Sequence, residues 1–234
     1  MSCSRRQFII YSGALAAVGG VASHALANTM KIDGVRYGMV HDENLCIGCT
    51  ACMDACREVN QVPESVSRLT IIRSEPIGQF PDVKYRFFRH SCQHCESAPC
   101  VDVCPTGASF IDKTTGIVDV NPDLCVGCQY CIAACPYRVR FIHPINKTAD
   151  KCDFCRKTNL KKGKQPACVE SCPTKALTFG NLDDPKSDIS LMLKEKPTYR
   201  FKIALGTHPK MYRVPFKYGE VSQWQQLLLS ILNP

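Results

Sequence analysis

CVGCQYCIAACP, at 125–136, places four cysteines at the spacing C-x2-C-x2-C-x3-C and ends in a proline. The segment CIGCTACMDAC, at 46–56, repeats that spacing. A third group, at 92–104, widens the second gap to four residues, and a fourth, at 152–172, widens it to twelve while keeping both ends of the pattern. Self-similarity of this kind marks an internal repeat, so the chain is organised around four cysteine groups.

Cysteine usage is far above the ordinary level. The 234 residues include 17 cysteines, several times the usual share. Cys3 lies in the first 27 residues, and the remaining sixteen belong to the four groups with no thiol left over. Groups one to four are, in order, Cys46, Cys49, Cys52 and Cys56; Cys92, Cys95, Cys100 and Cys104; Cys125, Cys128, Cys131 and Cys135; and Cys152, Cys155, Cys168 and Cys172.

The spacing within the groups distinguishes between metal centres. Structural zinc sites typically use two C-x-x-C pairs separated by a longer loop. Cysteines at i, i+3 and i+6 followed by a fourth are instead the bacterial ferredoxin pattern, in which three thiolates bind one [4Fe-4S] cluster and the fourth binds its neighbour. Proline follows Cys104, Cys135 and Cys172, as this pattern prefers, whereas Arg57 follows Cys56. We therefore expect four [4Fe-4S] clusters; a cysteine-rich secreted protein with zinc or disulfides is the alternative of another class.

The first 27 residues form a separate element. Arg5 and Arg6 precede a weakly apolar run rich in Gly and Ala, and Ala25-Leu26-Ala27 closes it. This pattern predicts a twin-arginine signal peptide, residues 1–27, and hence a periplasmic protein. An uncleaved N-terminal membrane anchor is the alternative. Because the twin-arginine route exports folded proteins, the thiols would reach an oxidising compartment with their cofactors already bound.

The segments between the groups indicate how the groups pair. Residues 105–112 and 117–120 read as two short strands joined by the turn 113–116, and they lead directly into group three. That is the layout of one two-cluster ferredoxin, so groups two and three share a module. Groups one and four must then pair across it, and each is followed by a strand of its own, at 69–73 and 176–179.

The predicted fold is therefore α+β, with two ferredoxin-like two-cluster modules, one inserted in the other, and many loops. We expect an outer module at 28–84 plus 146–184, an inner module at 85–145 and a C-terminal extension at 185–234. Each cluster takes three ligands from one group and the fourth from the partner group. The predicted ligand sets are Cys46, Cys49, Cys52 and Cys172 (site 1); Cys152, Cys155, Cys168 and Cys56 (site 2); Cys92, Cys95, Cys100 and Cys135 (site 3); and Cys125, Cys128, Cys131 and Cys104 (site 4).

Charge and the remaining motifs exclude other classes. The formal charge of +8 falls to +6 when the leader is removed, and four clusters at −2 each bring the total to about −2. The basic residues thus compensate for the cofactors, and no basic stripe suggests nucleic acid.

A local cluster of Arg156, Lys157, Lys161, Lys162 and Lys164 is either a solvated loop or a docking patch for an acidic partner. The five histidines beyond the leader, namely His41, His90, His94, His143 and His208, are expected at the surface or beside the ligands.

Several long segments resemble a known family. They are VRYGMVHDENLCIGCTACMDACREVN at 35–60, YRFFRHSCQHCESAPCVDVCPTGAS at 85–109, NPDLCVGCQYCIAACPYRVRFIHP at 121–144, ADKCDFCRKTN at 149–159 and CPTKALTFGNLDDP at 172–185. These segments are similar to the iron–sulfur subunits of the periplasmic formate-dependent nitrite reductase system, the NrfC family. The ligand runs are shared with the electron-transfer subunits of polysulfide, thiosulfate, tetrathionate and dimethyl sulfoxide reductases.

The resemblance implies an electron-transfer subunit with no catalytic residues of its own. Its implied partners are a membrane-integral quinol-oxidising subunit, NrfD-like, and a multihaem cytochrome c that feeds nitrite reduction to ammonia. The chain agrees in lacking a nucleophile elbow, a phosphate loop and a dinucleotide fingerprint. The alternative within this class is the iron–sulfur subunit of a molybdopterin oxidoreductase. Residues 224–234, WQQLLLSILNP, lie beyond the resemblance and receive no function.

Overall fold

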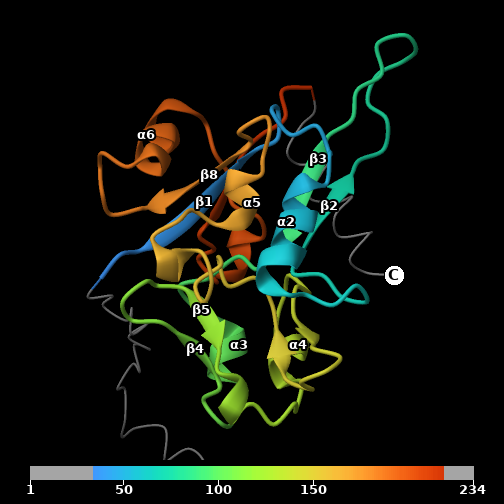
Figure 1. Ribbon diagram of the computed structural model, residues 1–234. Coiled ribbons are helices and arrows are strands. Elements are labelled where there is room, and N and C mark those ends of the chain that lie inside the picture. The colour runs from blue at the N-terminus through green and yellow to red at the C-terminus, as the bar shows by residue number, and fades with distance from the viewer. Residues whose placement is uncertain (1–33, 219–234) are drawn as a thin grey trace, which may run out of the picture.

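The computed structural model describes residues 34–218, so the predicted signal peptide and the segment 224–234 lie outside the described residues. The described part is an α+β fold of short helices and small sheets joined by many loops, as predicted (Figure 1). The β4–β5 hairpin with α3 and α4 lies at one end, and a three-stranded sheet with α6 lies at the other (Figure 1). The cysteines form much of the core between them.

The three-stranded sheet has the order β8-β1-β9. Its strands are β1 (Tyr37–Asp42), β8 (Leu177–Asn181) and β9 (Met211–Val214). β1 pairs antiparallel with β8, so Met39 faces Phe179, and parallel with β9, so that Met39 also faces Met211. The sheet thus joins the start, the late middle and the end of the described chain.

Three two-stranded ladders complete the β structure. They are β2 (Leu69–Arg73) with β3 (Phe87–Ser91), β4 (Ser109–Ile111) with β5 (Val118–Val120), and β6 (Phe141–Ile142) with β7 (Ala149–Asp150). The strand expected at 69–73 and the hairpin expected after group two are confirmed. Because β2 pairs with β3, the expected module boundary between residues 84 and 85 falls inside a hydrogen-bonded hairpin.

Each of four helices carries cysteines of one group. They are α2 (Ala51–Asn60), α3 (Pro99–Asp102), α4 (Tyr130–Ala133) and α5 (Ala167–Glu170). α2 packs against α5, and α3 packs against α4. A further helix, α6 (Asp188–Glu195), is capped by the Ser187 side chain, which accepts from the Ser190 amide, and it packs against β8. The 3₁₀ turns are Pro122–Leu124, Leu160–Lys162 and Ile203–Leu205.

A buried ionic network joins the C-terminal end of the fold to its middle. The Glu43 carboxylate, whose side chain is fully buried, lies 2.6 Å from Arg86 Nε and 3.6 Å from Arg213 Nη1. Tyr199 donates its hydroxyl to the same carboxylate at 2.7 Å. Since a charge removed from water is stable only when paired and hydrogen-bonded, this network fixes β9 against β1 and β3.

The basic loop within group four, between Cys155 and Cys168, is partly neutralised. Arg156 lies 2.5 Å from Asp112 and 2.8 Å from Asp119, and Lys157 lies 3.3 Å from Asp119. These ion pairs attach the group-four loop to the β4–β5 hairpin, so the first two of the five basic residues act within the fold.

In residues 34–218 no helix combines the length and the apolar character needed to span a membrane.

Candidate metal centres

Site 1 is a hollow between the loop before α2 and the segment before β8. The thiols of Cys46, Cys49, Cys52 and Cys172 line it, around about 350 Å³ of space not filled by protein atoms. Burial raises the pKa of the Cys46 thiol to about 11, and the nearby thiols of Cys52, Cys172 and Cys49 act in the same direction. The structure therefore brings the fourth cysteine of group four to the first three of group one.

Site 2 lies deeper, and all four of its cysteines are buried. They are Cys56, Cys152, Cys155 and Cys168. Burial is the main cause that raises the pKa of Cys56, and the nearby thiols of Cys152, Cys168 and Cys155 raise it further. Asn60, at the end of α2, donates from its Nδ2 atom to Cys155 Sγ at 3.4 Å and to Cys56 Sγ at 3.7 Å. This contact joins groups one and four a second time.

Site 3 is equally enclosed. Its cysteines, Cys92, Cys95, Cys100 and Cys135, are each less than 10% exposed. Burial raises the pKa of Cys95 to about 12, and the thiols of Cys92, Cys100 and Cys135 contribute in the same direction. The Cys100 thiol, on α3, likewise has its pKa raised by burial to about 11.

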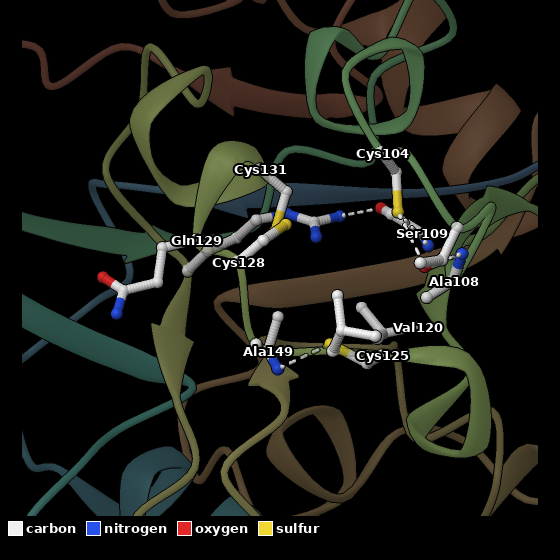
Figure 2. A pocket seen from close by; sticks show the side chains of 13 residues that line it. Cys104, Ala108, Ser109, Val120, Cys125, Cys128, Gln129, Cys131 and Ala149 are labelled. Atoms are coloured by element: carbon white, nitrogen blue, oxygen red, sulfur yellow. Dashed lines mark hydrogen bonds between the residues drawn. The ribbon is translucent and has the colours of Figure 1, made fainter.

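Site 4 lies at the end of the molecule that carries the β4–β5 hairpin. Figure 2 shows the side chains of Cys104, Cys125, Cys128 and Cys131 around one hollow, with about 340 Å³ of space between the atoms. The Ala149 amide donates to Cys125 Sγ at 3.4 Å, so β7 closes one wall. Cys128 is exposed, as is Cys49 at site 1, whereas sites 2 and 3 have no exposed cysteine.

The last cysteines of groups two and four share a local structure. Cys104 and Cys172 each begin the sequence Cys-Pro-Thr-x-Ala. In both, the threonine hydroxyl lies 3.7 Å from the cysteine sulfur. A backbone amide, that of Ser109 or of Ala176, donates to the same sulfur at 3.3 Å. Burial opposes ionisation of Cys104, but the bonds from Ser109 and Thr106 outweigh it and lower its pKa. N–H and O–H donors aimed at sulfur favour the thiolate, which is the form that binds metal.

The third position of the first C-x-x-C turn in each group has a left-handed backbone. At sites 1 and 4 it is Gly48 and Gly127, with φ of 72° and 68°. At sites 2 and 3 it is Phe154 and His94, with φ of 54° and 46°. A large residue in this region costs about 1–3 kcal/mol and persists only where its surroundings hold it.

Two buried arginines lie beside the thiol sets. The Arg89 guanidinium, on β3, donates to Cys168 Sγ at 3.6 Å, and thiolates of sites 2 and 1 counter the effect of its burial and raise its pKa. Arg140 lies in the same way between sites 3 and 4. Burial lowers its pKa, but the thiolates of Cys100, Cys92 and Cys131 outweigh that effect and raise it. Neither cation pairs with a carboxylate among residues 34–218, and Arg89 Nε and Arg140 Nη1 have no hydrogen-bond partner there.

These observations test whether [4Fe-4S] clusters fit the four sites. Buried cations without carboxylates need an anion close by, and a cluster with four thiolates carries a net charge of −2. Donors aimed at the sulfurs and hollows lined by four thiols fit the same cofactor. No three His, Cys, Asp or Glu side chains in the described ranges converge as ligands of a single ion. The residues present fit iron–sulfur clusters.

The structure thus groups the sixteen thiols into the four predicted sets; their ligation of clusters stays a prediction. Sequence reasoning missed Arg89, Arg140 and Asn60, because a single cation or amide on a strand or helix carries no spacing signal. The repeated Cys-Pro-Thr-x-Ala could have indicated Thr106 and Thr174. Of the histidines, His41 and His94 are buried completely, and His94 lies inside the group-two turn.

Comparisons with known proteins place the chain among iron–sulfur proteins. A family model described as a 4Fe-4S dicluster domain matches residues 83–182, and one described as a 4Fe-4S binding domain matches residues 43–59. The chain is 80% identical to the protein NrfC of Escherichia coli K12, over 95% of this chain and 100% of that protein. It is 54% identical to the B subunit of the polysulfide reductase of Wolinella succinogenes, over 80% of this chain and 97% of that subunit. It is 49% identical to the thiosulfate reductase electron transfer subunit PhsB of Salmonella typhi, over 76% of this chain and 92% of that subunit.

Proposed function

Because the chain belongs to the NrfC family of 4Fe-4S proteins, we propose that it is a periplasmic electron-transfer subunit that carries four [4Fe-4S] clusters and no catalytic site. Its clusters lie in two nested ferredoxin-like modules. The outer module, 28–84 plus 146–184, holds sites 1 and 2, and the inner module, 85–145, holds sites 3 and 4. Arg89 connects the two modules, because it belongs to the inner segment while its guanidinium lies beside the thiols of sites 1 and 2 in the outer module.

The observation that carries the proposal is the succession of the four thiol sets. Sites 1 and 2 adjoin, since Cys52 affects the pKa of Cys168 and Arg89 faces both sets. Arg140 faces sites 3 and 4 in the same way. The turns of sites 2 and 3 meet where the rings of His94 and Phe154 stack. The order is therefore 1, 2, 3, 4, with an exposed cysteine at each end and none in the middle.

This arrangement suits electron transfer and little else. Each cluster, when bound, accepts and releases one electron at a time without rearranging bonds to a substrate. The protein's own residues bury sites 2 and 3 away from water and surround all four with thiols, amides and cations. Electrons enter and leave at sites 1 and 4, where a partner's redox group can approach. We assign no substrate to the chain.

The proposed donor is a membrane-integral quinol-oxidising partner, NrfD-like, and the proposed acceptor is a multihaem cytochrome c that serves nitrite reduction to ammonia. The 80% identity to NrfC supports this route over others. A quinol releases two electrons and two protons, so two single-electron transfers through the clusters balance each quinol oxidised. Membrane association comes through the partner. Exposed apolar residues beside the terminal sites, Ile47 at site 1 and Val126 at site 4, suit docking at either end.

A second candidate is the iron–sulfur subunit of a molybdopterin oxidoreductase. The 54% identity to a polysulfide reductase subunit supports this candidate. The ligand spacing does not distinguish the two candidates, because it suits either electron acceptor equally. The two candidates differ only in the acceptor. Gene neighbours encoding a multihaem cytochrome support the first, and a neighbouring molybdenum catalytic subunit supports the second.

The proposal predicts a brown protein with about sixteen irons and sixteen acid-labile sulfides per chain, four of each per cluster. Potentiometric EPR of the purified protein then resolves the clusters. Electron delivery is tested by adding the reduced protein to an oxidised multihaem cytochrome c and following haem reduction. A colourless protein with only zinc or disulfides contradicts cluster binding, and full cluster content without haem reduction contradicts the proposed acceptor.

A further inference from the structure

The junction between sites 2 and 3 consists of two stacked rings. His94 lies between Cys92 and Cys95 in the site 3 turn, and Phe154 lies between Cys152 and Cys155 in the site 2 turn. Their ring centroids are 3.7 Å apart with an interplanar angle of 22°. Phe179 of β8 meets the Phe154 ring edge-on, with the two ring centroids 5.2 Å apart.

Glycine occupies the corresponding position at the two outer sites. Gly48 and Gly127 adopt the same left-handed backbone without steric cost, whereas His94 and Phe154 adopt it with full side chains. A ring at this position is thus confined to the two turns that face each other. The chain keeps an unfavourable backbone at both turns and gains one contact between the modules.

The His94 imidazole has no hydrogen-bond partner among the described residues, although it is completely buried. Both Nδ1 and Nε2 are unpartnered. Whatever its tautomer or protonation state, an imidazole carries at least one N–H that needs an acceptor. The charged side chains that face this ring are Lys151, Lys210, Arg89 and Arg140. Those four side chains are donors and cannot accept that hydrogen.

We propose that the ring N–H of His94 donates a hydrogen bond to a sulfur atom of the central pair of clusters, those of sites 2 and 3, and that the Phe154 ring holds the imidazole in place. Sulfur is the acceptor that the cofactors would bring to this junction. A hydrogen bond to cluster sulfur stabilises the reduced, more negative state and so raises the reduction potential. His94 is then a positioning residue that adjusts one step in the middle of the electron route.

The inference rests on the proposed cluster content, so iron and sulfide are counted first in every variant. The variant His94→Phe keeps an aromatic ring against Phe154 but has no N–H. It should retain its iron while the midpoint potential of a central cluster becomes more negative. We expect about a tenfold change in the ratio of oxidised to reduced cluster at fixed potential, which is about 59 mV for one electron.

Assignment of the shifted EPR signal uses two marker variants. Cys95→Ser perturbs site 3 and Cys155→Ser perturbs site 2, so the signal that each one changes identifies the cluster. The control is His208→Phe, the same change at an exposed histidine, which should leave all four potentials unchanged. A His94→Phe protein with full iron and four unchanged potentials overturns the proposal, and so does a shift confined to site 1 or site 4.

A second pair of variants keeps the test decisive if His94→Phe loses iron. His94→Gln retains an N–H donor and His94→Leu does not, and both side chains are close to histidine in size. The proposal expects a potential near the original in the Gln variant and a more negative one in the Leu variant. Equal potentials in the two, or loss of iron from both, overturn it, whereas a wild-type protein without iron would contradict the proposed function itself.

Discussion

Asn60 donates from its side-chain Nδ2 to the Sγ atom of Cys155 at 3.4 Å, although the two residues are 95 positions apart in the sequence. The same Nδ2 lies 3.0 Å from the Cys56 carbonyl oxygen, and the Thr158 hydroxyl donates to Asn60 Oδ1 at 3.2 Å. The amide is therefore held from both sides while it faces the sulfurs of site 2. One side chain at the end of α2 contacts both cysteine groups that build that site.

Asn60→Leu should lower the reduction potential of the site 2 cluster. The change removes the N–H that stabilises the thiolate and keeps a side chain of similar size. A net hydrogen bond of about 1 kcal/mol corresponds to a shift on the order of 40 mV for one electron. Potentiometric EPR measures it. Asn146→Leu, at an exposed position, is the control, and an unshifted site 2 signal in Asn60→Leu would contradict the assigned role.

The pairing of the groups is tested by Cys172→Ser. This change removes a thiol that lies with Cys46, Cys49 and Cys52, more than a hundred residues earlier, so it should alter the site 1 signal and spare sites 3 and 4. Combined with Cys49→Ser, it should still damage only one cluster. EPR with iron counting distinguishes the outcomes. Loss of two distinct clusters in the double variant would show that the nested pairing is wrong.

Arg140→Met should lower the potentials of the clusters at sites 3 and 4 together. At a representative separation of about 6 Å and an effective dielectric constant near 20, a cation stabilises an extra electron by roughly 3 kcal/mol, which corresponds to a shift on the order of 100 mV. Arg140→Lys keeps the charge and should shift both potentials less. The measurement is a potentiometric EPR titration. Unchanged potentials at full iron content would remove Arg140 from the electrostatics of these sites.

Glu43→Gln should destabilise the protein by about 3–5 kcal/mol. The carboxylate is the buried counter-ion of Arg86 and Arg213, and removing one partner of a buried pair leaves the other charge uncompensated. Loss of iron–sulfur absorbance during denaturant titration reports the change. Glu96→Gln, which breaks a half-exposed pair with Arg36, is the matched control and should cost about 1 kcal/mol or less.

Export is tested by replacing Arg5 and Arg6 with lysine. The substitution conserves charge, but a twin-arginine signal is read as paired guanidinium groups. If residues 1–27 are such a signal, folded precursor with its clusters should accumulate in the cytoplasm. Cell fractionation with antibody detection and iron analysis measures its distribution. Equal periplasmic delivery of the double lysine variant would rule out the twin-arginine route.

The four cysteine groups could be recognised in the sequence because their information is local. Cysteine spacing, a proline after the last cysteine and the strand–turn–strand segment at 105–120 are all visible in short windows of sequence. The parallel pairing of β1 with β9 was not predicted, because Met39 and Met211 have no pattern in common and meet only when the whole chain has folded. The same limit applies to His94 and Phe154. Each looks ordinary in its own turn, and their contact depends on how two distant turns face each other.

The position of β1 at the centre of its sheet has a consequence for biosynthesis. β1 needs β8 on one edge and β9 on the other, and β9 ends at Val214. A ribosome must therefore release nearly the whole polypeptide before this sheet can close, even though the first cysteine group emerged long before. All four cysteine groups, which end at Cys172, have therefore been synthesised before the sheet closes.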